Sequence, residues 1–470
     1  MALTWVEITP RGENFSHTMN RIFEIGLIGG LILAAFAFGG TETPYFSVVQ
    51  ITLLGLGVLL LVTYNSVFVR DARPPVAIPF LLVAFVLVQW VHLPGSRNSL
   101  DAASFSGISI APYQTLSQLL ALVTYLVAFY LTVAVVRQPN GGRRVVFALL
   151  GLGMFEACYG LFQYLTGWQQ IFTYAKTINL EMATGTYINY DHFAGLLEMI
   201  FPFALACAYD QFQRIPASHR GMGRLLGVWG REESHKLILW LFLAIVFLAA
   251  IAFSESRMGL ISAIVSALLL AILVGTTRRR RISAGVLTLA FLVAGLCMVV
   301  WIGPEPVIAR FETLDRHHAG PARDRWAIWK DTAQLIGGHP WLGTGLGTFS
   351  VAYPLVQTAF AGKFVSHAHN DYLEFAAELG IPAALLLFGA VFYVLLQCTR
   401  SFYCSASRSE KTVALGCFGS LLAISLHSLT DFNLHIPANA LVFFVVLGLA
   451  RANSSNLYSV ASTASLVPRS

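Results

Sequence analysis

The sequence predicts an all-α polytopic membrane protein with about twelve transmembrane helices and one large loop outside the membrane. Of its 470 residues, 56% are hydrophobic and only 11% are charged, and the mean hydropathy is +0.68. These values exclude a soluble globular protein. Apolar runs long enough to cross a bilayer recur along the chain. Lys and Arg gather in every second connection between these runs, as in a chain that crosses a membrane repeatedly.

The first 302 residues hold nine of the predicted spans, and residues 371–451 hold the last three. Between them lies the large loop, residues 303–370. Residues 452–470 are expected to form a disordered tail, whose last five residues resemble the remnant of a protease-cleavable tag. The predicted spans are residues 22–40, 46–69, 76–93, 113–136, 145–166, 192–209, 237–254, 257–275, 283–302, 372–398, 412–430 and 436–451.

Only nine of the 30 Lys and Arg residues fall on the side of the membrane that carries the large loop. Positive residues favour the cytoplasmic side, so we expect both termini in the cytoplasm and the large loop outside. The net charge of +6 reflects this topology, and we infer no nucleic-acid partner from it. Most of the outer cations lie in the large loop, which favours an anionic ligand there, with lipid headgroups as the alternative.

The large loop contains a predicted short amphipathic helix from Arg323 to Ile336. Its apolar stripe is expected to consist of Trp326, Trp329, Ala333 and Ile336, with Arg325, Lys330, Asp331 and Gln334 beside it. Two Trp residues suit the headgroup boundary of a membrane. The glycines at 343, 345 and 347 predict tight turns and lack the Lys and the spacing of a nucleotide phosphate loop.

The loop ends on two histidines, His367 and His369. Asn370 is expected to cap the following helix, with Asp371 and Glu374 in its first turn. His369 would then lie at the rim of the membrane, where the positive end of the helix dipole favours a neutral imidazole that accepts a proton. Alternatively, both histidines are only polar loop residues.

Two other outer-side segments carry polar candidates. Arg257 lies between two apolar runs with hardly any loop, and a charge placed there usually faces a cavity or a partner, unless it extends to water. The entry to the sixth span is polar and aromatic, and its side chains could hold a sugar. The candidate substrate-binding residues are Lys176, Tyr187, Asn189, Asp191, His192, Arg323, His367 and Asn370.

We predict no metal site. His367 and His369 could bind zinc together with His317, His318 or His339, but no Cys and no clear outer carboxylate set completes such a site. The role of Glu198, inside the sixth span, stays open between a functional carboxyl and a partner of another helix. For His427, Asp431 and His435, we expect helix-end hydrogen bonds, with a place in the cavity wall as the alternative.

Several motifs resemble those of the bacterial O-antigen ligase and polymerase superfamily. In the large loop they are Arg325-x-x-x-Trp329, His339-Pro340-Trp341-Leu342-Gly343-x-Gly345-x-Gly347-x-Phe349, and His367-Ala368-His369-Asn370-x-x-Leu373. Outside it, the Ser256-Arg257 step, the stretch from Thr184 to Leu196 and the stretch from Asp431 to Asn439 are also similar to members. The resemblance runs from about Gly160 to Ala450.

This resemblance implies a GT-C-like, metal-independent, inverting glycosyltransferase of the inner membrane, with no cofactor. Such enzymes transfer a glycan preassembled on undecaprenyl pyrophosphate to an acceptor hydroxyl of a glycan or glycolipid at the periplasmic face. By motif, His369 would be the catalytic histidine, and Arg257 and Arg325 would bind the donor diphosphate. Many relatives have an Arg where this chain has Met182, so a contact from that position would be lost or supplied by Lys176.

Other functions remain open at this stage. A ligase, which accepts a lipid A core sugar, is preferred over an O-antigen or exopolysaccharide polymerase, which accepts a second lipid-linked repeat. Twelve spans also suit a transporter of lipid-linked sugars, but the candidate polar groups gather at the outer face and the halves show no repeat. A non-catalytic membrane scaffold would leave the histidines and arginines unexplained.

Overall fold

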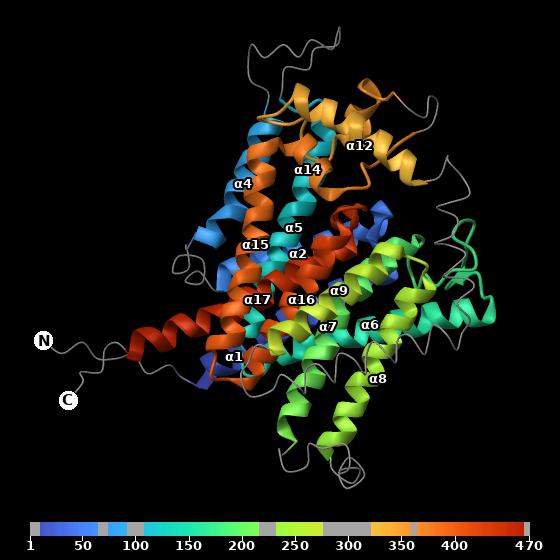
Figure 1. Cartoon of the computed structure of the whole chain (residues 1–470). Coiled ribbons are helices and arrows are strands. Elements are labelled where there is room, and N and C mark those ends of the chain that lie inside the picture. Colours follow the sequence, from blue (N-terminus) through green and yellow to red (C-terminus); the bar gives the residue numbers. More distant parts are fainter. Residues whose placement is uncertain are drawn as a thin grey trace, which may run out of the picture.

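The computed structural model describes residues 10–63, 74–91, 108–215, 232–275, 321–358 and 364–464. In these residues the chain is a bundle of helices (Figure 1). The sheet structure within the described ranges is one antiparallel hairpin, formed by β1 (Gln170–Ile171) and β2 (Tyr174–Ala175). The predicted class, an all-α polytopic membrane protein, is confirmed.

Nine of the described helices are long and apolar enough to cross a membrane. They are α1 (Pro10–Phe36), α2 (Thr43–Thr63), α5 (Pro112–Val136), α6 (Gly141–Thr166), α7 (Tyr190–Arg214), α8 (Glu232–Phe253), α9 (Arg257–Gly275), α15 (Ile381–Cys404) and α17 (Pro437–Ala464). Two further helices, α4 (Pro74–Trp90) and α16 (Arg408–His427), coincide with the predicted spans 76–93 and 412–430. The predicted span 283–302 lies outside the described residues, as does the large loop up to residue 320.

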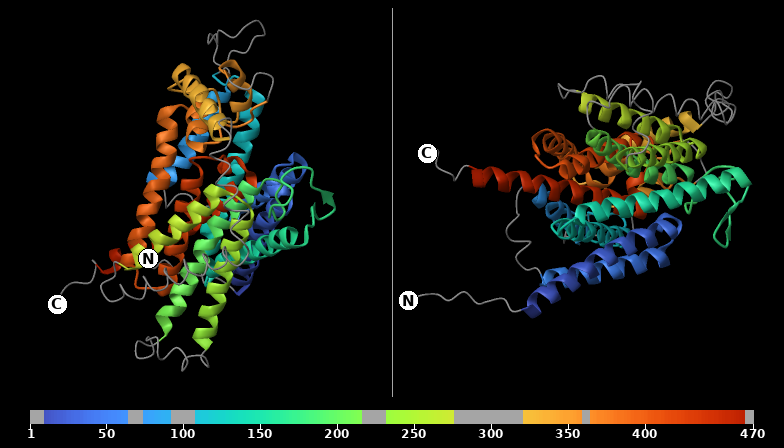
Figure 2. Two further views of the ribbon diagram at one scale, coloured as in Figure 1. Left: turned by 45° about the vertical axis from the view of Figure 1, so that its right-hand side comes forward. Right: turned by 90° about the horizontal axis from the view of Figure 1, so that it is seen from below.

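Helix α7 is the centre of the bundle. It packs against α8, α9, α16 and α17, and 89% of its most apolar stretch is buried. Small residues let α16 approach it closely: a Cβ added to Gly416 would lie 2.2 Å from the ring of Phe203. Helices α1 and α2 lie side by side at one edge of the bundle (Figure 2). The polar N-terminal turn of α7 is therefore surrounded by other helices.

The predicted span 372–398 is wrong as one helix, because the structure divides it into α14 (Asp371–Leu379) and α15. The break is at Gly380, whose φ of +78° favours glycine. The turn after the amphipathic helix packs against this point, and a Cβ on Gly380 would lie 2.5 Å from the carbonyl oxygen of Trp341. Ile381 N donates to Pro340 O at 2.8 Å. The large loop therefore folds back onto the break between the two helices.

The predicted amphipathic helix is confirmed as α12 (Pro321–Gly338), which lies beside α14 at one end of the bundle (Figure 1). Its buried face differs from the predicted stripe. Trp326 is 68% exposed, whereas Ile328, Asp331 and Leu335 are buried. Asp331 lies inside because it accepts hydrogen bonds from the Tyr353 hydroxyl and from the backbone and hydroxyl of Thr358. These bonds tie the later part of the loop to α12. That part includes α13 (Phe349–Ala352) and the 3-10 turn η4 (Tyr353–Leu355), and a further short 3-10 turn, η1 (Phe38–Gly40), follows α1.

Candidate functional site

The loop that carries His369 is held in place by the helix it precedes. Asn370 caps α14, as predicted: its Oδ1 accepts from Leu373 N at 3.0 Å. Its Nδ2 donates to Leu429 O at 2.8 Å. His369 itself has a φ of +51°, in the left-handed region that residues other than glycine adopt only when their surroundings enforce it. The conformation of His369 is therefore set by its neighbours on both sides.

Helix α12 holds the same loop from the other direction. The indole nitrogen of Trp329 donates to the carbonyl oxygen of Ala368 at 3.0 Å, and Ala368 N donates to Glu374 Oε2 at 2.8 Å. Ala368 is thus fixed between α12 and α14, with His367 and His369 on either side of it. Arg325 lies one turn before Trp329 on the same helix, so the predicted cation and the two histidines belong to one locally fixed unit.

Within the described residues, His369 forms an ion pair with Asp431, a residue for which the sequence predicts only helix-end hydrogen bonds or a place in the cavity wall. Nδ1 of His369 lies 3.5 Å from Asp431 Oδ1, and the two side chains are 35% and 2% exposed. Burial by itself would raise the pKa of Asp431, but the imidazoles of His369 and two neighbouring histidines outweigh burial and hold this pKa below its ordinary value. Asp431 is therefore a carboxylate, and it faces Nδ1 of a histidine whose ring remains partly open to solvent.

Asp431 also connects His369 to the start of α7. Nε2 of His192 lies 3.9 Å from Asp431 Oδ2. A carboxylate oxygen of Asp191 lies within 4.8 Å of one of Asp431. Asp191 in turn accepts a hydrogen bond of 2.6 Å from the hydroxyl of Ser256, which precedes Arg257. Arg325 interacts electrostatically with Asp191. The N-termini of α7 and α9, helix α12 and the loop of His369 therefore meet in one polar region.

The ring of Phe432 forms the centre of this histidine group. His367 stacks on it at a centroid distance of 4.0 Å, while His369 and His192 meet it edge-on at 5.0 and 4.8 Å. Phe432 is itself 8% exposed. One aromatic side chain next to Asp431 therefore packs against three of the predicted site histidines and fixes their rings relative to each other.

A second group of charges lies beside the first. Nδ1 of His367 is 2.7 Å from Glu374 Oε1, and Nδ1 of His435 is 2.8 Å from Asp371 Oδ1. His435 belongs to the short 3-10 turn η5 (Asn433–His435). Burial alone would lower the pKa of His435, but Glu374 and Asp371 outweigh burial and raise it well above its usual range.

Inside the bundle, Glu198 and His427 form a buried pair. Nδ1 of His427 is 3.1 Å from Glu198 Oε1, and the two side chains are 1% and 0% exposed. Nε2 of His427 lies 3.9 Å from Asp431 Oδ2. The structure therefore connects the carboxyl of Glu198 through His427 to Asp431, which favours a polar chain behind His369 over an isolated interhelical contact.

The other predicted residues lie at different depths. Asn189 caps α7, with its Oδ1 accepting from Asp191 N at 2.8 Å. Tyr187 is 1% exposed and donates to Asn439 Oδ1 at 3.0 Å, so in the structure it packs in the core. Lys176 donates to Met182 O at 3.2 Å, and burial lowers its pKa to about 8. The side chain of Arg323 lies outside the described part of the chain.

Some residues of the site are harder to predict from the sequence, although most of them share a recognisable sequence pattern. Asp431, Phe432 and His435 form a short polar and aromatic interruption between two apolar runs, in a motif that resembles the family. Glu374 has the position of an ordinary first-turn carboxylate, which predicts a favourable interaction with the helix dipole and nothing more. Its bonds to His367 and Ala368 come from the loop folding back over the helix, which no local pattern indicates.

Taken together, the site offers a histidine whose Nδ1 faces a carboxylate and whose ring reaches solvent, next to a helix that brings a guanidinium. A carboxylate at Nδ1 keeps the hydrogen on that nitrogen and leaves Nε2 free to accept a proton. A guanidinium suits phosphate oxygens. The arrangement fits proton abstraction beside a bound anion.

Comparison with known proteins gives the same family as the sequence motifs. A sequence model described as O-antigen ligase matches residues 242–388. The match includes Arg257, Arg325, His367, His369 and Glu374 and ends before Asp431. No curated protein sequence matches the chain. Residues 242–388 of this multi-pass membrane protein therefore match an O-antigen ligase domain, which supports the O-antigen ligase and polymerase superfamily that the motifs resemble.

Proposed function

We propose that this protein transfers a preassembled glycan from undecaprenyl pyrophosphate to an acceptor hydroxyl at the periplasmic face of the bacterial inner membrane. The observation that carries the proposal is the contact between His369 and Asp431, 3.5 Å apart, in the polar region that also holds Arg325. In this proposal both termini are cytoplasmic, in line with the distribution of Lys and Arg.

His369 acts as the general base. The acceptor hydroxyl has a high pKa, so it attacks the anomeric carbon efficiently only if its proton is removed during the attack. Nε2 of His369 takes that proton, and Asp431 stabilises the imidazolium that forms. The new bond joins the acceptor oxygen to the anomeric carbon, and the bond from that carbon to the diphosphate oxygen breaks. Attack from the face opposite the diphosphate inverts the anomeric centre.

Arg257 and Arg325 bind the departing diphosphate. Arg257 begins α9 directly after Ser256, whose hydroxyl donates to Asp191, and Arg325 interacts electrostatically with the same Asp191. Both cation-bearing segments therefore have the carboxyl group of Asp191 as a neighbour. Guanidinium groups can match the charge that develops on the leaving diphosphate, so the transfer step requires no divalent metal.

The acceptor is proposed to be a lipid A core sugar, as in a ligase. The domain that matches is described as O-antigen ligase, which supports this choice. A polymerase, whose acceptor is the sugar end of a second lipid-linked repeat, would use the same donor site and the same base.

The test is transfer by the purified protein in liposomes that contain an undecaprenyl-pyrophosphate-linked glycan and either a lipid A core glycolipid or only a second lipid-linked repeat. The native chain should move the glycan to the glycolipid. His369→Ala should lose about 10² to 10⁴-fold in rate while keeping its circular dichroism spectrum. His235→Ala, an exposed position at the start of α8, serves as the matched control.

Each outcome of this experiment has a separate meaning. Native-like transfer by His369→Ala would refute the assignment of the base. Elongation of the lipid-linked repeat without transfer to the glycolipid would identify a polymerase. Movement of the intact lipid-linked glycan between leaflets, with no sugar leaving the lipid, would favour a transporter.

A further inference from the structure

A set of nitrogen and oxygen atoms next to the catalytic loop has the spacing of a metal site. Nδ1 of His367 lies 2.7 Å from Glu374 Oε1, and Nε2 of His435 lies 3.4 Å from the same oxygen. All three donor atoms lie within 4.8 Å of one another. Donors that share one zinc ion at about 2.0–2.2 Å lie roughly 3–3.5 Å apart. The two distances from Glu374 Oε1 lie on either side of this range, so side-chain movements of about an ångström would place one ion between the three atoms.

Two buried polar atoms of this cluster have no hydrogen-bond partner. They are Nε2 of His435 and Oε2 of Glu378, which lie 3.9 Å apart. The side chains of His435 and Glu378 are 9% and 1% exposed, so bulk solvent does not reach these atoms. A buried polar group without a partner is costly and calls for an explanation. Glu378 Oε2 is near enough to His435 Nε2 to serve as a fourth ligand of an ion bound there.

The remaining nitrogen of His435 is fixed as it is in most metal-binding histidines. Its Nδ1 lies 2.8 Å from Asp371 Oδ1, and Asp371 also accepts hydrogen bonds from the Ser428 hydroxyl and from Leu434 N. A histidine that binds a metal usually donates its other ring hydrogen to a carboxylate, which orients the ring and selects the tautomer. Asp371 gives His435 this support, and Nε2 on the other side of the ring faces Glu374, where a bound ion would replace its hydrogen.

The charges of the cluster also favour a cation. Asp371, Glu374 and Glu378 are at most 1% exposed, and in the described part of the chain their ion pairs come from His367 and His435. Three carboxylates buried so close together repel each other, and their burial is costly unless cations compensate them. A divalent ion supplies that compensation in a single group.

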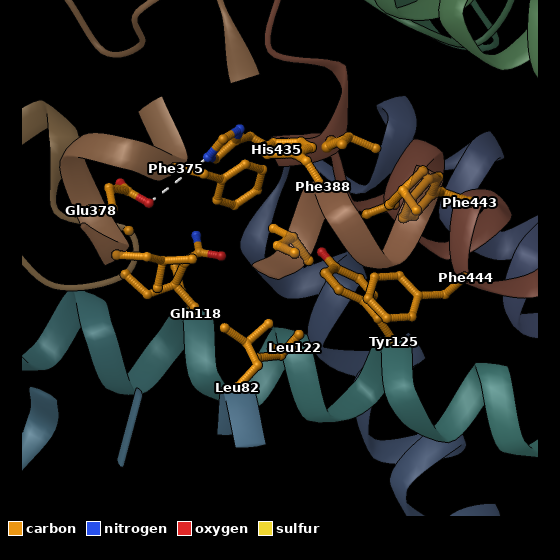
Figure 3. Close-up of a pocket in the computed structure, with 17 residues that line it drawn as sticks. Leu82, Gln118, Leu122, Tyr125, Phe375, Glu378, Phe388, His435, Phe443 and Phe444 are labelled. Atoms are coloured by element: carbon orange, nitrogen blue, oxygen red, sulfur yellow. Dashed lines mark ion pairs between the residues drawn. The ribbon is translucent and has the colours of Figure 1, made fainter. Parts of the chain in front are cut away.

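A largely apolar pocket adjoins the cluster. Figure 3 shows Glu378 and His435 at one end of it, with their ion pair marked, while Leu122, Phe388 and Phe444 line it further along. About 80 Å³ of the pocket is wide enough for water molecules. An ion could therefore complete its coordination with water from the pocket side, while the apolar walls keep bulk solvent away.

From this geometry we propose that His367, Glu374 and His435, with Glu378 in reach, bind one divalent transition metal ion of the zinc type. The ion would join three segments that are far apart in the sequence: the loop of His369, helix α14 and the turn before α17. Its role is to keep His369 and Asp431 in their relative positions, and it does not contact the reacting atoms. The proposal thus goes beyond the metal-independent transfer step and differs from the sequence-based expectation of no metal.

The test measures metal directly. The detergent-purified full chain, stripped by a chelator, is titrated with Zn²⁺ and then dialysed, and bound zinc is measured by elemental mass spectrometry. We expect about one zinc per chain and a raised unfolding temperature. His435→Gln and, separately, His367→Gln should each lower zinc affinity by about 10²-fold or more. His339→Gln, a histidine of the same loop outside the cluster, should bind zinc like the native chain.

The cobalt-loaded protein gives a second readout. Its visible absorption should report nitrogen and oxygen ligands and should vanish in His367→Gln, a position whose side chain is 29% exposed; circular dichroism checks that this variant is folded. Zinc retention below a tenth of an ion per chain, or equal binding by the native chain and both cluster variants, would overturn the proposal. Neither measurement depends on glycan transfer, so a protein that binds zinc without catalysing transfer would refute only the proposed function.

Discussion

At the scale of single residues, the decisive feature is the orientation of the His369 ring by the residues that contact it. Asp431 faces Nδ1 of His369 at 3.5 Å, and the polar chain continues through His427 to Glu198. Phe432 fixes the plane of the His369 ring. A base positioned this way loses little entropy when the acceptor binds, because its ring is already aligned.

The first prediction concerns Asp431→Asn, which keeps the size of the side chain and removes its charge. We expect kcat to fall by about 10²-fold or more with KM little changed, because the variant no longer stabilises the imidazolium of His369 but leaves the substrate contacts intact. Steady-state kinetics in liposomes check this. A rise in KM of the same size with kcat unchanged would instead assign Asp431 to substrate binding.

The ionisation of Asp431 at different pH values follows from the direction in which its pKa is shifted. Its pKa in the folded protein is below the ordinary value, so it contributes stability above about pH 4, and this contribution is lost as the pH falls through the folded-state pKa. Asp431 therefore stays ionised between about pH 5 and 9. The carboxylate infrared band that Asp431→Asn removes should therefore keep its intensity over that range. A band of the protonated carboxyl that grows towards pH 5 would show that Asp431 titrates there.

At the scale of elements, α12 has a structural role that its amphipathic pattern only partly reveals. Its indole at position 329 holds the loop between the two histidines, and its buried Asp331 gathers the segment around Thr358. The same helix presents Arg325. One short helix thus fixes the proposed base and one proposed diphosphate ligand relative to each other.

The second prediction compares two Trp residues of α12. Trp329→Phe removes the bond to Ala368 O and keeps most of the ring, so we expect a loss of about 0.5–1.5 kcal/mol in loop stability and up to about a tenfold fall in transfer rate. Trp326→Phe changes a side chain that is 68% exposed and should leave both unchanged. Hydrogen exchange of residues 364–370 and transfer kinetics are the measurements. Equal hydrogen-exchange rates and equal transfer rates in the two variants would contradict the role of Trp329.

The third prediction concerns the contact between α7 and the segment after Asp431. A Cβ on Gly195 would lie 2.1 Å from Asn433 Oδ1, and Asn433 also accepts from Asn439 Nδ2 at 2.9 Å. Gly195→Ala should therefore cost about 1–3 kcal/mol of stability and displace Asp431. Gly151→Ala, where nothing lies within 4 Å of the added atom, should be neutral or slightly stabilising. Thermal unfolding in detergent compares them, and equal unfolding temperatures would refute the close contact.

At the scale of the whole molecule, the site lies where separate helix ends meet. The N-termini of α7, α9 and α14 all contribute to it, and their dipoles together favour negative charge in the space between them. The bundle core around α7 holds these ends in place. This arrangement suits a lipid-linked diphosphate that approaches from the membrane boundary, with α12 beside it.

The fourth prediction is the membrane orientation. In a background in which the exposed Cys158 and Cys404 are replaced, Trp326→Cys should react with a membrane-impermeant maleimide in intact spheroplasts. His235→Cys, exposed at the start of α8, should react only after the membrane is permeabilised. The expected difference follows from the excess of Lys and Arg on the His235 side. The reverse pattern would place the site in the cytoplasm.

Much of the fold follows from the sequence, because hydropathy and capping act locally. Apolar length predicts the helices, polar flanks and glycines predict the limits of α12 closely, and Asn370 predicts the start of α14. His369, Arg257 and Arg325 are predicted as site residues from motifs that include them. These features depend on a few neighbouring residues, so a single chain reveals them.

Only the tertiary structure determined which distant groups meet. It paired His369 with Asp431, 62 positions later, joined Glu198 to His427, and brought Glu374 and Glu378 against His435. It also broke the predicted span at Gly380, because the large loop folds back onto that point. Such contacts result from how helices pack and loops return, and the local periodicity of one sequence does not specify that packing.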